Sequence, residues 1–468
     1  MKNKTLLWFR QDLRLHDNKA LLEAVSAGYI LPIYIYDTSI PNEFIMGAAS
    51  RVWLHHALLS LNKSLNNNLH FFRGNPQDIL LELIQKYNIT QINWNRCYDK
   101  WQITRDTEIK KTLQQQRIIV NSFNASLLWE PWEVLKLDGT PYKVFTPFYH
   151  KGCLTKKEPH IPLAKPQEIN FILTPYKTSI TDLNLLPKIR WDQKILTSWN
   201  ISEDGALQQL QNFISNNIDS YKIGRDFPAQ NSTSKLSSYL HFGQISPNTA
   251  WYSAKMAGFS DNIDNFLKEL GWREFSYSLL YYYPNLYKEN WQQKFDTFPW
   301  QQDSEKLQAW QRGQTGIPII DAGMRELWQT GYMHNRVRMV VASFLVKNLL
   351  IDWRHGAKWF WETLFDADLA NNSASWQWVA GSGADAAPYF RIFNPITQSE
   401  KFDPEGIYIK KYVPELTLLP TKYLFDPWLA PEEVLQNAKI KIGIDYPKPI
   451  IDLKKSRENA LNIFKLLD

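Results

Sequence analysis

The chain has few cysteines and no long apolar segment. Only Cys97 and Cys153 occur among its 468 residues, which is too few for a disulfide framework, a multi-cysteine metal site or an iron–sulfur cluster. No stretch reaches the run of about 18 apolar residues that predicts a transmembrane helix. Residues 1–10 lack the apolar region and cleavage site of a signal peptide. We therefore expect a cytoplasmic protein with no resident metal and no membrane partner.

Glycine is also scarce, whereas tryptophan is abundant, with 19 Gly against 20 Trp. Average usage would give about 33 glycines in a chain of this length. Hydrophobic residues make up 44% and charged residues 21%, which excludes a disordered or collagen-like chain. The net charge of +6 permits binding to nucleic acid but equally suits an enzyme with a slightly basic surface.

Short apolar runs alternate with helical patterns up to about residue 130. Residues Arg51–Leu65 and Asp78–Tyr87 have helical periodicity. Strands that alternate with helices predict an α/β domain with a Rossmann-like parallel sheet. The turn Arg10–Arg14 contains no glycine, so it is neither a dinucleotide fingerprint nor a P-loop. The runs expected to form strands are Leu6–Phe9, Ile30–Tyr36, Leu69–Phe72, Gln91–Trp94 and Ile118–Phe123.

The rest of the chain changes character twice. Prolines are frequent in residues 131–195 and periodicity fades there, which indicates a long connecting segment over the surface. From residue 196 onward the pattern is helical, as in Asn262–Tyr283 and Pro318–Thr330. We therefore expect an α/β domain in residues 1–130, a linker in residues 131–195 and an all-helical domain in residues 196–468.

Two polar clusters in the helical part admit more than one interpretation. Spacings of three and four residues place Glu269, Trp272 and Arg273 on one helix face. They form either a surface ion pair over a packed Trp or part of a site. The hydroxyl-rich segment Thr233–Ser237 predicts a helix N-cap, where hydroxyls and backbone N–H groups hold phosphate, although such clusters are common.

Two further clusters lie nearer the C-terminus. The polar segment His334–Arg338 begins an otherwise apolar helix, so its buried cations need carboxylate partners. Asp366 and Asp368 are the candidates, in an interhelical salt bridge or around a ligand. Trp376 and Trp378, followed by Arg391, suit stacking on nucleobases or on a flavin.

Together these segments resemble the photolyase/cryptochrome family over essentially the whole chain. Leu-Leu-Trp-Phe-Arg-Gln-Asp-Leu-Arg-Leu-His-Asp-Asn (6–18) resembles the family's opening strand and loop. Thr-Gly-Tyr-Met-His-Asn-Arg-Val-Arg-Met (330–339) and Asp-Ala-Asp-Leu-Ala-Asn-Asn-Ser-Ala-Ser-Trp-Gln-Trp (366–378) resemble its flavin-binding core. The resemblance implies an α/β antenna domain, a linker and a helical FAD domain.

The resemblance also implies residues that hold FAD. Arg338 and Asp366 match a charged pair beside the flavin ring, and Asn372 matches the residue that faces its redox-active nitrogen. Asp368 matches a residue near the polar edges of the cofactor, and Arg273 a phosphate or ribityl contact. The residues that match the pyrophosphate loop and helix start are Tyr221, Thr233, Ser234, Lys235, Leu236 and Ser237.

Other residues match the family's substrate cavity, electron relay and DNA rim. A cyclobutane pyrimidine dimer has apolar faces and carbonyl edges, and it has lost normal stacking and pairing, so flipping it out is cheaper than flipping intact bases. The residues that match its cavity are Glu269, Trp272, Asn335, Met339 and Trp378. The electron relay matches Trp300, Trp353 and Trp376. The expected phosphate contacts are Arg225, Arg336, Arg391 and Lys401, with Trp272 and Trp378 stacking on the dimer.

Within the family, three segments are most similar to plant cryptochromes and their bacterial sister photolyases. They are residues 46–51, 122–134 and 239–246. We expect a class III photolyase that splits dimers in UV-damaged DNA with light and reduced FAD, acting as a monomer.

The alternative within the family is a cryptochrome-type photoreceptor. Asn372 and Asn335 stand where plant photoreceptors carry Asp, and the chain ends at Asp468 without their long tail. A photolyase for a different lesion and a hydride-carrying flavin oxidoreductase remain more distant alternatives.

The antenna chromophore is harder to assign. Enterobacterial relatives use a Glu in this loop to hold a folate, whereas Gln102 stands at that place in Asn95–Gln102. We expect 5,10-methenyltetrahydrofolate first and a deazaflavin second.

Overall fold

The computed structural model describes residues 3–175 and 178–467. Cα packing divides the chain into two compact units. The N-terminal unit consists of residues 1–216 and 234–284, and the C-terminal unit of residues 217–233 and 285–468. The fold class expected from the sequence is confirmed, with a parallel-sheet α/β part followed by helices. The expected domain boundaries stay a prediction.

A parallel sheet organises the N-terminal unit, in the strand order β3-β2-β1-β4-β5. All five predicted strands form, within a few residues of the expected bounds. The short strand β6, Asn170–Phe171, was not predicted and pairs with the start of β2. The five strands are β1 Asn3–Phe9, β2 Gly28–Asp37, β3 His70–Gly74, β4 Gln91–Asn95 and β5 Ile119–Phe123.

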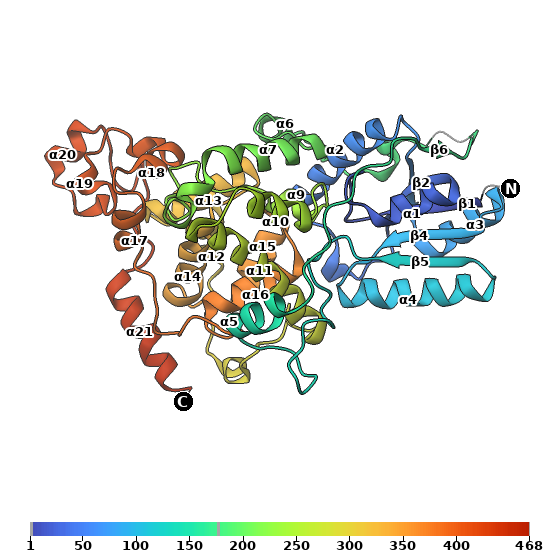
Figure 1. Cartoon of the computed structure of the whole chain (residues 1–468). Helices are drawn as coiled ribbons and strands as arrows, with labels where there is room; N and C mark the ends of the chain where they lie inside the picture. The colour runs from blue at the N-terminus through green and yellow to red at the C-terminus, as the bar shows by residue number, and fades with distance from the viewer. Residues whose placement is uncertain (1–2, 176–177, 468) are drawn as a thin grey trace. The chain divides into compact units, whose positions relative to one another are not determined.

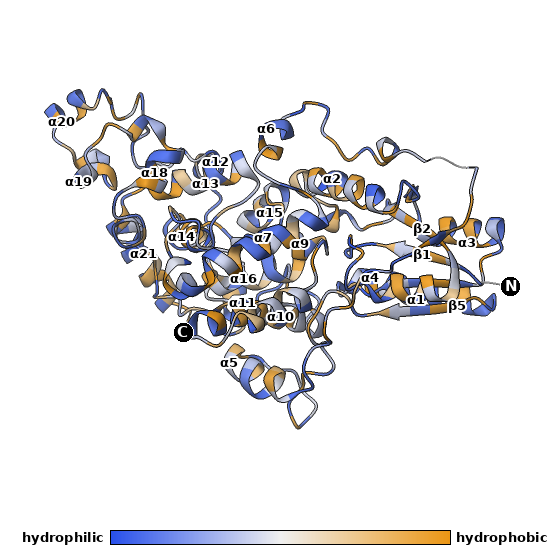
Figure 2. Cartoon of the chain, turned by 45° about the horizontal axis from the view of Figure 1, so that its top comes forward, coloured by the Kyte–Doolittle hydropathy of each residue, from blue (hydrophilic) through white to orange (hydrophobic). Residues whose placement is uncertain are grey.

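Helices connect and cover the strands, as Figure 1 shows for α4 beside β5. The sheet core is apolar, with Trp8 of β1 and Trp94 of β4 in edge-to-face contact. The first helices are α1 Lys19–Ala27, α2 Ala48–Ser64, α3 Pro76–Tyr87 and α4 Lys100–Gln115. Figure 2 shows hydrophobic and hydrophilic residues alternating around α1 and α2, as expected for helices with one buried side.

The proline-rich segment is less superficial than predicted. Phe148, Tyr149 and Cys153 are all buried in the N-terminal unit, so part of this segment belongs to the core. Its short helices are α5 Phe145–Pro147 and α6 Asp192–Leu196. The longer helices that complete the unit are α7 Glu203–Asn216, α10 Pro247–Met256 and α11 Asp261–Tyr282, together with the short α9 Ser237–His241.

The C-terminal unit is helical around a large apolar core. Its α13 has the predicted bounds because Pro318 fits the first turn and Gly331 ends it at φ +67°. The helices are α8 Tyr221–Gly224, α12 Ser304–Arg312, α13 Pro318–Thr330, α14 Asn335–Ser343, α15 Trp353–Thr363, α16 Leu369–Ala380, α17 Pro395–Phe402, α18 Ile407–Tyr412, α19 Thr421–Leu424, α20 Glu432–Asn437 and α21 Leu453–Lys465. The π-helical turn η7, Phe344–Asn348, continues α14.

No helix within residues 3–175 and 178–467 combines the length and the apolar character needed to span a bilayer.

Candidate functional site

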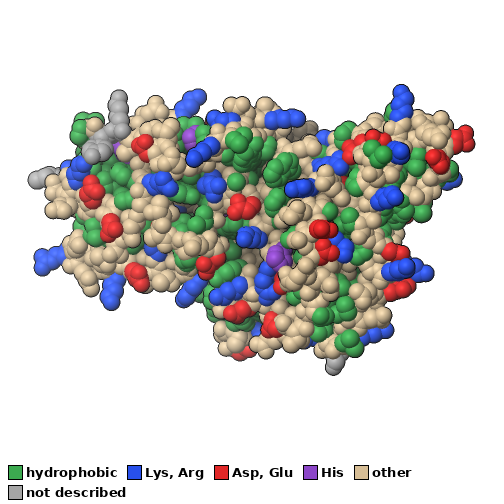
Figure 3. Space-filling model, turned by 180° about the vertical axis from the view of Figure 1, so that it is seen from behind, with side chains coloured by type: hydrophobic (Ala, Val, Ile, Leu, Met, Phe, Trp, Pro, Cys, Tyr) green, Lys and Arg blue, Asp and Glu red, His purple; other side chains and the backbone are tan. Residues whose placement is uncertain are grey.

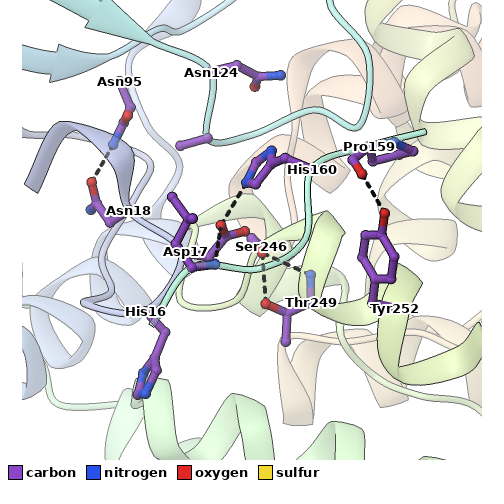
Figure 4. A network of polar contacts seen from close by, with 12 residues as sticks. His16, Asp17, Asn18, Asn95, Asn124, Pro159, His160, Ser246, Thr249 and Tyr252 are labelled. Carbon is purple, nitrogen blue, oxygen red and sulfur yellow. Dashed lines mark hydrogen bonds and ion pairs between the residues drawn. The ribbon is translucent and has the colours of Figure 1, made fainter. Parts of the chain in front are cut away.

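The loop after β1 is fixed by buried polar contacts within the N-terminal unit. Arg14 is 1% exposed and donates to the carbonyl oxygens of Ala125 and Gly243, at 2.8 and 2.9 Å. Asp17 accepts from His160 Nε2 at 2.7 Å, as Figure 4 shows. These contacts join the loop to the proline-rich segment and to the turn after α9, so they organise the unit rather than form a phosphate cradle.

Trp272 of α11 has a partner that the sequence did not reveal. Its ring stacks on Phe145 with centroids 3.8 Å apart and planes 9° from parallel. Phe145 is buried, whereas Trp272 and Glu269 are half-buried on α11. The stack fixes the plane of the indole, which suits a wall for a flat apolar ligand.

One interpretation of the sequence was a simple surface ion pair between Arg273 and Glu269. The contacts that Arg273 makes are different. Its Nη1 donates to the Ser126 carbonyl oxygen at 2.6 Å and lies 3.5 Å from Glu274 Oε1. Glu274 is fully buried and accepts from the backbone N–H groups of Leu128 and Trp129. Burial raises the pKa of Glu274 to about 7, against the opposing charge of Arg273. Sequence reasoning missed Glu274.

The predicted hydroxyl cap at Thr233–Ser237 is wrong in detail. Helix α9 begins at Ser237, and its N-cap is Leu236, which makes no side-chain cap bond. Lys235 takes a left-handed φ of +51°, and the Ser234 carbonyl oxygen accepts from Gln209 Nε2 at 3.0 Å. Thr233 belongs to the C-terminal unit, where its hydroxyl lies 3.5 Å from that of Tyr332.

Several predicted ligand contacts gather at the start of α14 in the C-terminal unit. Arg336 pairs with Asp226 at 2.6 Å, and its guanidinium lies 4.3 Å from the Phe402 ring centroid. Arg225 lies over the ring of the buried Tyr221 at 5.4 Å. The predicted DNA and pyrophosphate contacts Tyr221, Arg225 and Arg336 are therefore linked in one cluster by Asp226, which neighbours Arg225 in the chain.

The expected carboxylate partner of Arg338 is confirmed. Arg338 binds Asp366 in a fork, at 3.1 Å from Nη1 to Oδ1 and 2.9 Å from Nη2 to Oδ2. Burial alone would lower the pKa of Arg338, but the Asp366 carboxylate raises it above its usual value. The Nε–H donates to the Met333 carbonyl oxygen at 2.7 Å, so the guanidinium plane is fixed. Such a pair offers a fixed charge to a planar polar ligand.

Helix α16 presents the other predicted flavin contacts. Asp368 caps it by accepting from the N–H of Asn371 at 2.8 Å. Asn372 donates its amide N–H to the Ala357 carbonyl oxygen of α15 at 3.0 Å. Because one of the two N–H donors of this amide is bound to α15, the nitrogen end faces that helix, and the amide oxygen of Asn372 remains as the acceptor that a protonated ring nitrogen requires.

The remaining predicted cavity and rim residues are distributed over α14, α16 and the segment that follows it. Asn335 is exposed at the start of α14, while Met339 and Trp378 are half-buried. Arg391 and Lys401 are exposed, as DNA phosphate contacts must be. In Figure 3, Lys and Arg side chains are spread over the visible face among Asp and Glu.

Of the three predicted relay residues, Trp353 and Trp376 lie on the packed helices α15 and α16, and Trp300 lies in the loop before α12. Trp376 of α16 is buried and packs so close to Gly356 of α15 that a methyl there would lie 2.1 Å from its ring. Trp353, at the start of α15, donates its Nε1–H to Asn290 at 2.9 Å. Trp300 is half-buried against Phe298, with ring centroids 4.3 Å apart.

The described residues of the C-terminal unit fit a flavin nucleotide. The forked Arg338–Asp366 pair and the acceptor oxygen of Asn372 suit the polar edge of the ring. The buried Nε2 of His334 has no hydrogen-bond partner within the described residues, which is the state expected of a donor that serves a ligand.

Two family descriptions match the sequence. Residues 5–167 match the DNA photolyase family, and residues 266–466 match the FAD binding domain of DNA photolyase.

Individual relatives cover nearly the whole chain. The deoxyribodipyrimidine photo-lyase of Agrobacterium fabrum is 46% identical over 97% of this chain and 96% of its own length. Cryptochrome-2 of Arabidopsis thaliana is 36% identical over 98% of this chain and 78% of its own length. The crystal structure of a class III photolyase from Agrobacterium tumefaciens superposes with a TM-score of 0.96 at 44% identity, covering 100% of this chain and 98% of that one.

Proposed function

The chain belongs to the photolyase/cryptochrome family, and from this membership we propose that it is a deoxyribodipyrimidine photo-lyase that repairs UV-damaged DNA in light. The observation that carries this function is the position and pairing of Asn372 on α16, with its N–H held by Ala357. An amide can accept a hydrogen bond from reduced flavin but cannot readily release a proton to it. This chemistry favours repair over photoreceptor signalling, where plant relatives carry Asp.

We propose that the residues that match the family's cofactor site hold FAD. When bound, FAD supplies the electron that light drives into the dimer and takes it back after the ring has split. Arg338 and Asp366 orient the flavin ring, Asp368 and Asn372 contact its polar atoms, and Arg273 contacts the ribityl or phosphate part. The segment Thr233–Ser237 and Tyr221 hold the pyrophosphate.

The substrate is a cyclobutane pyrimidine dimer flipped out of DNA. Trp272, stiffened by Phe145, and Trp378 contact its apolar faces, while Glu269 and Asn335 hydrogen-bond its carbonyl edges and Met339 fills space. Arg225, Arg336, Arg391 and Lys401 bind the flanking phosphates. The net charge of +6 is compatible with this partner.

The relay Trp376, Trp353 and Trp300 would return the flavin to its reduced form by conducting electrons from the surface. Burial of Trp376 and Trp353 protects the inner members of this relay from water.

For the antenna we propose 5,10-methenyltetrahydrofolate, with a deazaflavin as the second choice. Gln102 is buried and its Oε1 has no hydrogen-bond partner among the described residues, so it can accept from an N–H of a pterin ring. The absorption spectrum of the extracted chromophores distinguishes the two, because folate absorbs in the near ultraviolet and deazaflavin in the violet. We further propose a cytoplasmic monomer.

The decisive experiment compares dimer-containing single- and double-stranded oligonucleotides in light and in the dark. We expect light-dependent loss of dimers in both substrates. Normal photoreduction of the flavin without dimer loss would instead assign the chain to the photoreceptors. That outcome is the second candidate function, and the similarity to Arabidopsis cryptochrome-2 supports testing it.

A further inference from the structure

His334 is held from two sides at the N-terminus of α14. Its ring Nδ1 accepts from the backbone N–H of Arg336 at 3.3 Å and so caps the helix. The backbone N–H of His334 donates to Glu326 Oε2 at 3.1 Å. Glu326 is in turn fixed by the hydroxyl of Tyr408 at 2.7 Å. The backbone of His334 is therefore anchored through Glu326 of α13, and its imidazole is oriented by the first turn of α14.

This geometry decides which ring nitrogen carries the proton. Since Nδ1 accepts a hydrogen bond, the proton of the neutral ring is on Nε2. Burial, followed by the charge of Arg338, lowers the pKa of His334 to about 4, so the ring is neutral near pH 7. The Nε2–H is thus a donor of fixed direction.

The donor has no protein acceptor within the described part of the chain. The His334 residue is 3% exposed, and its Nε2 has no hydrogen-bond partner there. Buried donors without a partner are rare in folded proteins because they forfeit the hydrogen bond that water would make. A ligand oxygen would satisfy this one.

The charged groups around His334 indicate which kind of ligand oxygen would accept its Nε2–H. Arg225, Arg336 and Arg338 all lower its pKa by their positive charge, and Asp226 opposes them. The N-terminus of α14 adds the positive end of a helix dipole. Arg336 pairs with Asp226 and Arg338 with Asp366, but three guanidinium groups beside a helix N-terminus, together with the unbonded Nε2–H, still favour an anionic oxygen such as that of a phosphate.

We propose that His334 is a positioning residue whose Nε2–H donates to a phosphate oxygen of the bound ligand. This inference rests on the proposed function, which supplies two sources of phosphate: the pyrophosphate of FAD and the DNA backbone beside the dimer. By holding that phosphate next to the start of α14, His334 sets where the ligand lies relative to Asn335 and Met339.

The test uses two variants of the full chain. His334→Asn keeps a cap, because its Oδ1 can still accept from the Arg336 N–H, but it has no donor at the place of Nε2. His334→Ala loses both functions. The measurements are flavin retained per chain after dialysis, dissociation constants for dimer-containing and undamaged DNA, and the melting temperature of the flavin-free protein.

We expect His334→Asn to keep the melting temperature of the flavin-free protein and to lose about tenfold in one binding step. Loss of flavin assigns the phosphate to FAD, whereas weaker DNA binding at unchanged flavin content assigns it to DNA. His334→Ala should show the same loss and a lower melting temperature. The inference is overturned if His334→Asn binds both flavin and DNA within twofold of the wild type.

Failure of the proposed function would look different. In that case the wild-type chain itself would clear no dimer in light, whatever its affinity for flavin. The flavin and DNA titrations of the two variants would still report on the role of His334.

Discussion

Asn372 of α16 donates its amide N–H to the carbonyl oxygen of Ala357 in α15, at 3.0 Å. The bond fixes which end of the amide faces away from α15. A carboxylic acid at this position would have no N–H to give to that carbonyl. It would bond there only when protonated, and it would then carry an acidic proton close to the proposed flavin ring.

Replacement Asn372→Asp should therefore change the photochemistry. We expect dimer repair to fall about tenfold, because the hydrogen bond of the neutral amide is lost. Illumination should also produce the absorption spectrum of a protonated, partly reduced flavin, since the acid can give up a proton. Spectra recorded during illumination and dimer counts measure the two effects. Asn437→Asp, an exposed change on α20, should alter neither; equal repair by both variants would contradict the role of Asn372.

The amino-acid sequence predicted those parts of the fold and of the candidate site that local chemistry determines. Pro318 and Gly331 delimit α13 because their backbone preferences act within one turn. The partner of Arg338 could be foreseen because a guanidinium that is largely withdrawn from water requires a carboxylate nearby.

Contacts set by chain packing were not predictable in the same way. Phe145 reaches Trp272, and Leu128 reaches Glu274, only because the proline-rich segment and the residues just before it fold back on α11. The periodicity that revealed α11 carries no information on what covers it. At α9, the hydroxyls of Thr233–Ser237 suggested a cap, but the backbone places Leu236 there.

Removal of the Arg338 charge should release the flavin. Arg338→Gln leaves Asp366, whose side chain is 7% exposed, without its forked partner. We expect the flavin retained per chain to drop by about tenfold or more. The free energy of unfolding should fall by about 2 kcal/mol. Flavin absorbance and denaturant unfolding of the flavin-free protein provide the measurements.

The matched control for that change is Lys306→Gln. Lys306 pairs with Asp303 at 2.8 Å, but both side chains are about a third exposed. Solvent screening should keep the loss of stability below about 0.5 kcal/mol, with full flavin content. If the two variants behaved alike, the Arg338–Asp366 pair would be an ordinary surface bridge.

The stack of Phe145 on Trp272 should matter for the substrate rather than for the cofactor. Phe145→Leu keeps most of the apolar volume but removes the flat surface that holds the indole plane. We expect affinity for dimer-containing DNA to fall about threefold to tenfold, with unchanged flavin content, in binding titrations. Phe44→Leu, which disturbs a looser stack on Trp101 with centroids 6.1 Å apart, should leave this affinity unchanged. An equal loss of affinity for undamaged DNA would argue against Trp272 as a wall of the dimer site.

Replacing Trp376 and replacing Trp353 should lower the free energy of unfolding by different amounts. The Nε1 of Trp376 has no hydrogen-bond partner in the described residues, whereas that of Trp353 donates to Asn290. Trp376→Phe should therefore cost less stability than Trp353→Phe, by about 1 kcal/mol. Both should slow photoreduction strongly, and both should still repair dimers when the flavin is reduced chemically beforehand.

A control variant for the relay is Trp199→Phe, at a half-buried ring in the N-terminal unit. It should photoreduce at the wild-type rate. Unchanged photoreduction in Trp376→Phe would remove that residue from the relay.

Lys347 predicts a pH dependence of stability. It lies in η7 at 1% exposure, with its Nζ donating to the Arg391 carbonyl oxygen at 2.9 Å. Burial, followed by the charge of Arg391, lowers its pKa to about 7. Because an unfolded lysine binds its proton up to about pH 10, the unfolded state holds more protons between these limits. The contribution of Lys347 to stability is therefore least favourable below pH 7 and improves as the pH rises.

Lys347→Met removes this titration while keeping the length of the side chain. The variant should gain most stability over the wild type at pH 6 to 7, and the gain should shrink by at most about 1.4 kcal/mol for each further pH unit. Denaturant unfolding at several pH values measures it, with exposed Lys358→Met on α15 as the control. Parallel curves for Lys347→Met and the wild type would show that the lysine stays charged in the folded protein, where its Nζ donates to the Arg391 carbonyl oxygen and lies 5.3 Å from the centroid of the Tyr389 ring.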